Sequence, residues 1–290
     1  MKIRKAVIAV AGYGTRFLPA TKVQPKELLP IVDKPIVQYL VEEVVASGIK
    51  DIVLVTRSGT QAIADHFDSS RELEAYLAEQ AKREYLEIVQ SIPKMANIAV
   101  VRQGGYLPYG NGTPILAAKS FLNEGQPFVY MFGDDLVMSD VPCVRQLTEA
   151  FMRHEPAAVV AAQEVPQSEI HRYGAMRLKN HAEPKELQSI IEKPSPGTAP
   201  SCLAQVGRFV LPWRIVEILE HLEVLNGDEL YLTAAIDRLC HEARVLVHPI
   251  EGKWLTTGDP LNFLKTNVVY ALRNAEIGRA FAEFLRNLKL

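Results

Sequence analysis

The amino-acid sequence predicts a single α/β domain, built on a Rossmann-like mixed, mostly parallel sheet with helices on both faces. Apolar segments typical of buried parallel strands alternate with amphipathic helical segments through the first 140 residues. The first strand, loop, helix and strand fit within about fifty residues, as a right-handed βαβ unit requires. Of the 290 residues, 48% are hydrophobic and 23% charged, so the chain can bury a full core.

The elements of the first half follow from their local patterns. Residues 6–11 and 51–56 are apolar runs that predict the first two strands. Between them, Pro35 and Gly48 are typical of the first turn and the C-terminal end of an amphipathic helix. Further along we expect a short helix at 58–68, a long charged helix at 71–90, strands at 98–101 and 128–132, and a helix at 115–121.

The second half begins at about Val141, where the pattern changes. We expect a helix at 142–154, strands at 157–165 and 206–211, a strand that ends near Lys193, a helix start within 227–236, and helical segments over 260–288. The last segments are amphipathic, so we expect them to pack on the sheet, with a subunit interface as a second use.

Charge and composition exclude several classes of protein. The net charge of −2 predicts no broad basic surface, so no nucleic-acid partner is expected. No apolar run approaches the ~20 residues of a membrane span, and the first residues do not resemble a signal peptide, so no membrane partner is expected. The cysteines, Cys143, Cys202 and Cys240, lie far apart without metal-ligand spacing. They are typical of reduced thiols in a cytoplasmic protein.

The first strand leads into a loop that combines glycine with positive charge. Gly12 and Gly14 let the backbone turn sharply and bring N–H groups close to a ligand. Arg16, Lys22 and Lys26 follow, and their cationic groups suit phosphate. Such a loop is built to hold several negative charges, and a triphosphate is the natural candidate. The third glycine of a dinucleotide fingerprint is missing, which argues against a dinucleotide oxidoreductase.

A longer string gives this loop a family resemblance. Residues 12–30 read Gly-x-Gly-Thr-Arg-x-x-Pro-x-Thr-Lys-x-x-Pro-Lys-Glu-x-x-Pro, which resembles the signature of the sugar-phosphate nucleotidylyltransferases. The Thr-Lys and Pro-Lys-Glu forms most resemble bacterial members that act on UTP and glucose-1-phosphate. The resemblance covers residues 5 to about 272. It implies the nucleotide-diphospho-sugar transferase type of fold, Mg²⁺ as cofactor, and a homodimer or homotetramer.

The resemblance also implies roles for charged residues. Arg16 would hold the β and γ phosphates, Lys26 would stabilise charge on the α-phosphoryl group, and Lys193 would orient the attacking sugar phosphate. Asp134 follows a buried strand, and a carboxylate at an exposed strand end is a natural Mg²⁺ ligand. The resemblance gives Asp134 that metal role. We expect the next residue, Asp135, to cap the following turn.

The remaining assignments complete two binding halves. The resemblance assigns to the nucleotide Ala11, Gly12, Gly14, Thr15, Gln103, Gly110 and Gly112. It assigns to the sugar phosphate Gly174, Glu192, Lys193 and Val206. We therefore divide the single domain 1–290 into a nucleotide-binding half (1–140), a sugar-phosphate-binding half (141–260) and a C-terminal helical segment (261–290).

Two departures from the family pattern leave the function open. After Gln103 the spacer is longer than in the family, and Thr113-Pro114 replaces His-Ala, so thymidylyl transfer to a sugar-1-phosphate remains an alternative. Thr256 stands where related enzymes have a second metal-binding aspartate, with Asp259 as a candidate substitute whose expected role is structural. A catalytically weak nucleotide-sugar-binding regulatory paralogue is therefore a further alternative. Mg²⁺ needs only one or two protein carboxylates, so the change does not exclude catalysis.

Overall fold

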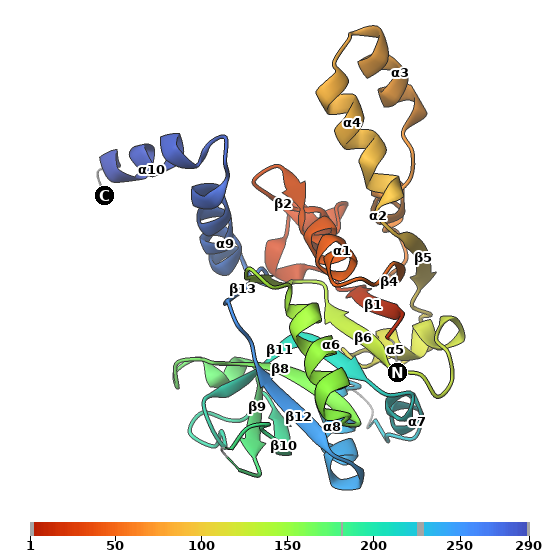
Figure 1. Ribbon diagram of the computed structural model, residues 1–290, viewed down its shortest axis with the longest axis vertical. Coiled ribbons are helices and arrows are strands. Elements are labelled where there is room, and N and C mark those ends of the chain that lie inside the picture. The colour runs from red at the N-terminus through yellow and green to blue at the C-terminus, as the bar shows by residue number, and fades with distance from the viewer. Residues whose placement is uncertain (1–2, 181, 225–228, 289–290) are drawn as a thin grey trace.

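The computed structural model describes residues 3–180, 182–224 and 229–288 (Figure 1). Within these residues a nine-stranded sheet has the order β10-β9-β11-β6-β1-β4-β5, with β8 paired to β11 and β12 paired to β8. The strands are β1 (Lys5–Val10), β4 (Asp51–Thr56), β5 (Asn97–Arg102), β6 (Phe128–Phe132), β8 (Ala158–Glu164), β9 (Gly174–Leu178), β10 (Leu187–Glu192), β11 (Leu203–Leu211) and β12 (Val245–Pro249).

The first half of the sheet is parallel, which confirms the predicted fold class. β1 lies between β4 and β6, and both pairings are parallel. β5 adds a further parallel strand on the outside of β4. Because parallel strands end at the same edge, the loops after β1 and β6 meet there, and such an edge is where α/β sheets bind ligands.

The second half joins the same sheet through β11. This strand pairs antiparallel with β6 of the first half and with β8 and β9 of the second. β12 pairs in parallel with β8, so the sheet is mixed. The sheet is therefore continuous across the predicted boundary near residue 141, and the division into two halves stays a prediction.

Helices cover both faces of the sheet (Figure 1). On one face, α1 and α6 pack in a core cluster with β1, β4 and β6; on the other, α5, α7 and α8 pack in a second cluster. Along each strand alternate residues point to opposite faces, so the two clusters share the same strands. The helices are α1 (Ile36–Ala46), α2 (Gln61–His66), α5 (Thr113–Ala118), α6 (Cys143–His154), α7 (Arg214–Glu220) and α8 (Leu232–Glu242).

Two short pairs of strands lie beside the main sheet. β2 (Pro30–Ile31) pairs with β3 (Lys34–Pro35) just before α1. β7 (Asp135–Met138) follows β6 and pairs antiparallel with β13 (Lys253–Thr256). The second pair brings Thr256 directly opposite Asp135, although the two are far apart in the sequence.

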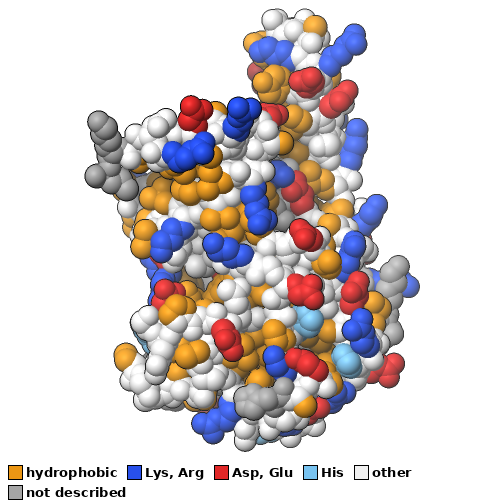
Figure 2. Space-filling view, turned by 60° about the vertical axis from the view of Figure 1, so that its left-hand side comes forward, with side chains coloured by type: hydrophobic (Ala, Val, Ile, Leu, Met, Phe, Trp, Pro, Cys, Tyr) orange, Lys and Arg blue, Asp and Glu red, His pale blue; other side chains and the backbone are white. Residues whose placement is uncertain are grey.

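The long charged helix expected at 71–90 is wrong, because the segment forms two helices. α3 (Arg71–Glu79) and α4 (Arg83–Ser91) make a hairpin that projects from the body, with charged and apolar side chains on its surface (Figures 1 and 2). Ala81 has a left-handed φ of 54°, and the Lys82 N–H donates to the Leu77 carbonyl. This is a Schellman-type helix end. Helical periodicity continues through it, so the pattern could not reveal it.

The C-terminal segment packs on the body only in part. α9 (Pro260–Arg273) contacts β13 and β2, while α10 (Gly278–Asn287) packs on α9 and extends away (Figure 1). The expected packing on the sheet is therefore wrong for α10. Of the predicted helix start at 227–236, residues 227 and 228 lie outside the described residues. Among the described helices, none is long and apolar enough to cross a membrane.

Candidate active site

A cavity of about 560 Å³ opens at the carboxyl edge of β1 and β6. It draws its lining from both halves of the chain, so ligands of both halves can meet in it. Twelve of the residues predicted from the sequence line it: Ala11, Gly12, Gly14, Thr15, Arg16, Lys26, Gln103, Gly110, Asp134, Gly174, Glu192 and Lys193.

Three residues placed near the ligands by the sequence do not line this cavity. Val206 is fully buried and packs in the core cluster on the α1 face. The Gly112 N–H donates to the Leu230 carbonyl at 2.9 Å, and an added Cβ would lie 2.7 Å from Leu219. Lys22 lies in the cation-rich loop of residues 12–30, called here the phosphate loop, and it is exposed and absent from the lining.

Short turns in the phosphate loop keep Arg16 and Lys26 at the cavity. Gly14 has φ +66°, a conformation that favours glycine. The Thr21 hydroxyl donates to the Gly14 carbonyl at 2.7 Å and closes the loop. A Cβ on Gly12 would lie 3.3 Å from Cε of Lys26, so the small residue gives this lysine its path into the cavity.

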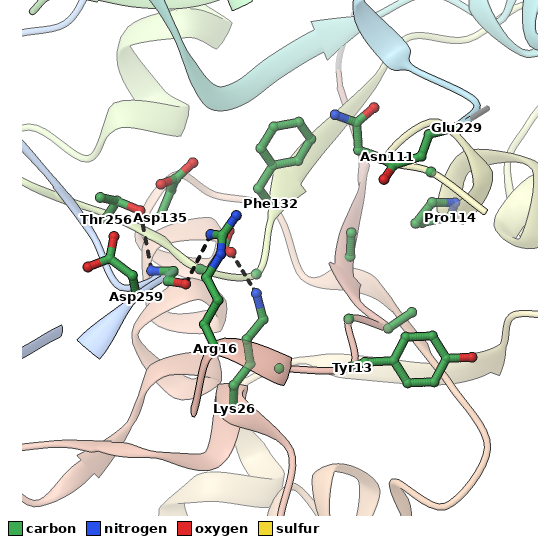
Figure 3. Close-up of a pocket in the computed structure, with 18 of the residues that line it drawn as sticks. Tyr13, Arg16, Lys26, Asn111, Pro114, Phe132, Asp135, Glu229, Thr256 and Asp259 are labelled. Carbon is green, nitrogen blue, oxygen red and sulfur yellow. Dashed lines mark hydrogen bonds and ion pairs between the residues drawn. The ribbon is translucent and has the colours of Figure 1, made fainter. Parts of the chain in front are cut away.

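Lys26 and Asp134 form an ion pair in the floor of the cavity. Nζ of Lys26 lies 2.6 Å from Oδ2 of Asp134 (Figure 3). Burial alone would lower the pKa of Lys26, but the carboxylates of Asp134 and Glu27 raise it above its ordinary value. Burial would raise the pKa of Asp134, but Lys26, and then Arg16, hold it below its ordinary value. Both side chains are therefore charged at neutral pH.

The segment after β13 holds this end of the cavity together. The Thr257 N–H and hydroxyl both donate to the Asp134 carbonyl, at 2.7 and 2.9 Å. Nη1 of Arg16 donates to the Gly258 carbonyl at 3.2 Å (Figure 3). These contacts place Arg16 beside Asp134 and leave Thr256 as a neutral side chain in the lining.

Asp135 does not cap the next turn, so that expectation is wrong. It lies in β7, and its Oδ1 accepts from Nε1 of Trp254 at 2.8 Å. Burial, with the charge of Asp134 next to it, raises the pKa of Asp135 to about 6, against the opposing Trp254 hydrogen bond. The pairing of β7 with β13 buries this carboxyl, and the sequence spacing could not show that pairing.

Asp259 has the structural role expected for it. Its Oδ1 accepts from the Asn262 N–H at 3.0 Å, so it caps the first turn of α9. Its Oδ2 accepts from Arg172 at 2.7 Å. Although Asp259 lines the cavity, both of its oxygens are therefore already bonded.

The end opposite Arg16 and Lys26 is lined by Tyr13, Asn111, Pro114 and Glu229 (Figure 3). Gly110 has φ +144°, and a Cβ there would lie 2.3 Å from the Leu230 carbonyl oxygen, so only glycine fits. The Leu230 N–H donates to the Tyr109 carbonyl at 2.7 Å. The rings of Tyr13 and Tyr109 lie 6.1 Å apart, with the Arg57 guanidinium over Tyr13. A flat ligand such as a base fits backbone groups and ring faces of this kind.

The second half contributes a polar wall to the cavity. Lys193 has φ 42°, and its N–H donates to the Tyr173 carbonyl at 3.1 Å. Its Nζ lies 3.7 Å from Oε1 of Glu192 and over the ring of Tyr231. Burial raises the pKa of Glu192, and the charge of Lys193 opposes the rise. The wall offers a carboxylate for hydroxyls beside a cation for phosphate.

Several residues that line the cavity were not predicted from the sequence. Tyr13 and Glu27 lie inside the recognised string, so the string itself could have drawn attention to them. Gln205 is a polar residue within the apolar strand β11, which is a usable signal. Trp254 and Arg172 lie close to predicted segments, but only long-range packing brings them to the cavity.

The oxygen-bearing side chains at the Asp134 end of the cavity suit a divalent cation that also binds phosphate. The side chain of Asp134 is partly exposed, and its Oδ2 accepts a hydrogen bond from Nζ of Lys26. Asp135 and Asp259 are bonded elsewhere, and Thr256 adds a hydroxyl. One carboxylate completed by phosphate oxygens and water suits Mg²⁺.

Residues 5–272 match the family model described as nucleotidyl transferase. A protein of Staphylococcus epidermidis named UTP–glucose-1-phosphate uridylyltransferase is 42% identical over 290 residues, which cover 100% of this chain and 99% of the relative. The solved structure of UTP-bound UGPase from Acinetobacter baumannii is 34% identical, with a TM-score of 0.91 and coverage of 99% of this chain and 100% of that chain. A UDP-glucose pyrophosphorylase complexed with UDP-glucose is 31% identical, with a TM-score of 0.84 and coverage of 94% and 100%. The chain therefore belongs to the nucleotidyl transferase family, and it resembles the UTP–glucose-1-phosphate uridylyltransferases along its full length.

Proposed function

We propose that the protein transfers a uridylyl group from UTP to glucose-1-phosphate, releasing pyrophosphate and forming UDP-glucose. The observation that carries this proposal is the Lys26–Asp134 pair, in a cavity that is also lined by the rings of Tyr13 and Tyr109 and by a polar wall. The full-length relative with the uridylyltransferase name, and the solved relatives described with UTP and UDP-glucose, support the same substrates.

The reaction joins two anions, so the protein's main task is to position them and reduce their repulsion. A phosphate oxygen of glucose-1-phosphate attacks the α-phosphorus of UTP in line. The bond between the α-phosphorus and the oxygen that bridges the α and β phosphates breaks, and pyrophosphate leaves. The attacking phosphate is already ionised at neutral pH, so no general base is required.

The residues that line the cavity take separate roles in this scheme. Arg16 holds the β and γ phosphates, and Lys26 stabilises charge on the α-phosphoryl group. Lys193 orients the attacking phosphate, and Glu192 accepts hydrogen bonds from sugar hydroxyls. Mg²⁺ held by Asp134 would neutralise nucleotide charge when bound.

The nucleotide base has a smaller set of contacts. Ala11, Gly12, Gln103 and Gly110 offer backbone and amide groups to it, while Gly14 and Thr15 face the phosphates. Gly174 leaves room for the sugar. Val206 and Gly112 take no role in this scheme, because neither lines the cavity.

The first experiment measures pyrophosphate release with UTP, glucose-1-phosphate and Mg²⁺, with dTTP in a parallel reaction. We expect fast release with UTP and slow release with dTTP. Faster release with dTTP would keep the mechanism and reject the proposed base. Absence of release with either nucleotide, while UTP raises the melting temperature, would reject the enzyme and favour a nucleotide-sugar-binding paralogue.

We also propose a cytoplasmic homodimer or homotetramer. Exposed apolar side chains on α9 and α10, including Leu261, Leu264 and Phe284, support an additional contact between subunits. The free cysteines and the intracellular nature of the substrates support the location. Light scattering of the purified protein tests the assembly, and a mass of one chain at micromolar concentration would reject it.

A further inference from the structure

Gln205 places a buried amide oxygen, unpaired among the described residues, at the wall of the cavity. The residue lies in β11, is only 5% exposed and lines the cavity. Its Oε1 is buried and has no hydrogen-bond partner among the described residues. Buried polar side chains are ordinarily hydrogen-bonded, so an amide left unpaired at a cavity indicates that something else pairs with it.

A glycine packs against Gln205 on the neighbouring strand. Gly174 on β9 faces it, and a Cβ on Gly174 would lie 3.4 Å from Cβ of Gln205. The same Cβ would lie 3.0 Å from Cγ2 of Thr233, so a side chain at Gly174 would fill the space in front of this wall. Glu192 also lines the cavity here, and its Oε2 is buried without a partner among the residues described.

The neighbouring residue shows that this placement depends on strand direction. Val206 is fully buried on the face that packs against α1. Gln205 points to the other side of β11, because adjacent strand residues face opposite sides of a sheet. A polar side chain therefore occupies the cavity side of a strand whose other residues are mostly apolar.

The chemistry of an amide selects a hydroxyl group as its partner. Gln offers two donors and an acceptor, and a hydroxyl is itself both donor and acceptor. A phosphate at neutral pH accepts only, and Arg16, Lys26 and Lys193 already offer cations to phosphate. Glu192 accepts without donating when it is ionised. The two side chains thus provide complementary partners for neighbouring hydroxyls.

We propose that Gln205 binds one ring hydroxyl of the sugar-1-phosphate and, together with Glu192, determines which sugar the cavity accepts. This assignment rests on the proposed uridylyl transfer. Gln205 acts as a specificity residue and takes no part in bond making or breaking.

The test compares wild type with Gln205→Met, a variant that keeps side-chain length and removes the amide. The substrates are glucose-1-phosphate and its 2-, 3-, 4- and 6-deoxy analogues, each with saturating UTP. We expect kcat/KM for glucose-1-phosphate to fall roughly tenfold in the variant, since one hydrogen bond is lost. KM for UTP should not change. For the one analogue that lacks the hydroxyl bound by Gln205, the two proteins should have equal kcat/KM.

Gln146→Met is the matched control. Gln146 is a buried glutamine outside the cavity, and its amide donates to the carbonyls of Val141 and Glu251. We expect this control to lower the melting temperature and leave sugar specificity unchanged. Gln205→Met should keep or raise the melting temperature without ligand, because it removes a buried amide oxygen that has no partner among the described residues.

The outcomes separate this assignment from the proposed function. An active wild type and a variant with the same relative kcat/KM for every analogue would reject the role of Gln205 alone. A lower melting temperature of Gln205→Met without altered specificity would make the residue structural and also reject it. A wild type that releases no pyrophosphate from UTP and glucose-1-phosphate would reject the uridylyl transfer and the assignment with it.

Discussion

Two ion pairs in this protein share their chemistry and differ in their surroundings. Lys26 and Asp134 meet at the cavity floor, with side chains 16% and 29% exposed. Arg208 and Glu43 meet in the core between β11 and α1, with side chains 0% and 10% exposed. Both pairs place a cation against a carboxylate, but only the first opens onto the cavity.

The core pair has nearly all of its hydrogen-bonding groups occupied. Arg208 donates to both oxygens of Glu43 and to the carbonyls of Gly207 and Asp135. Oε1 of Glu43 also accepts from the Val144 N–H at 3.1 Å. The pair therefore joins α1, α6, β7 and β11, and it has little capacity left for a ligand.

The Lys26–Asp134 pair can form further hydrogen bonds. The Lys26 ammonium group donates a hydrogen bond to Asp134, and an ammonium group can donate three hydrogen bonds. The neighbouring residues Asp134 and Asp135 separate the two environments: the first side chain faces the cavity, and the carbonyl of the second binds Arg208. The comparison teaches that unused hydrogen-bonding capacity, rather than charge itself, distinguishes an ion pair that can bind a ligand from one that only supports the fold.

The largest expected effect is the loss of turnover in Asp134→Asn. The variant keeps the shape of the side chain and removes the charge that would hold Mg²⁺. We expect kcat to fall roughly 10⁴-fold, which is about 5.5 kcal/mol of transition-state stabilisation. Steady-state pyrophosphate release measures it. Turnover within tenfold of wild type would mean that the cavity pair is not catalytic, and the contrast with the core pair would fail.

Arg208→Met should instead reduce stability. It leaves the carboxyl group of Glu43 buried without its cation, and breaking such a pair costs about 3–5 kcal/mol. Urea unfolding measures the change, and kcat per folded molecule should stay within about threefold of wild type. The double variant Arg208→Met/Glu43→Leu is the control, because removing both charges should recover part of the loss. Full stability of the single variant would contradict the structural role.

Lys26→Ala should act mainly on kcat, because its charge is proposed to act on the transition state. Removing one such group costs roughly 10²–10³-fold. Lys22→Ala in the same loop is the matched control and should retain turnover, since Lys22 does not line the cavity. Unchanged turnover in Lys26→Ala, or equal losses in the two variants, would refute the assignment.

Glu27 tests the comparison through pH. Its Oε2 is buried without a partner in the described part of the chain, unlike the bonded oxygens of Glu43. Burial raises the pKa of Glu27 to about 7, although Lys26 opposes the rise. The native state therefore binds a proton that the unfolded chain releases above pH 4.5. The stabilisation from this proton is complete below pH 4.5 and is lost as the pH rises through 7.

The variant Glu27→Gln removes this pH dependence. As the pH rises from 5 to 8, the unfolding free energy of the variant minus that of wild type should increase by roughly 2–3 kcal/mol. Urea unfolding at four pH values in that range measures the gain. If the two stability curves ran parallel, Glu27 would be ionised in the native state throughout.

Local patterns in the sequence were enough for much of the fold. The apolar run before Gly12 and the helix between Pro35 and Gly48 are periodic over neighbouring residues, and the structure has β1 and α1 there. The string of residues 12–30 is also local, so its cations and glycines could be recognised together. Arg16 and Lys26 reach the cavity from within that one loop.

Single residues separate the structure from the local pattern. Ala81 ends α3 in a left-handed conformation without a glycine, so the segment expected as one helix forms two. The sequence assigns Val206 to the sugar, which stays a prediction; its side chain packs in the core, and its neighbour Gln205 lines the cavity. A shift of one residue along a strand moves a side chain to the other face. The motif around Val206 predicted the strand β11 but did not show which of its side chains line the cavity.

The sequence by itself determined the fold class, the family and the glycine- and cation-rich loop of residues 12–30, because each depends on residues close together along the chain or on a recognisable string. Only the tertiary structure decided that Trp254 bonds Asp135 and that Arg172 bonds Asp259. It also decided which of two chemically similar ion pairs is buried in the core and which faces the cavity. These outcomes depend on strand register and on contacts between residues more than 80 positions apart, which no local pattern of side chains specifies.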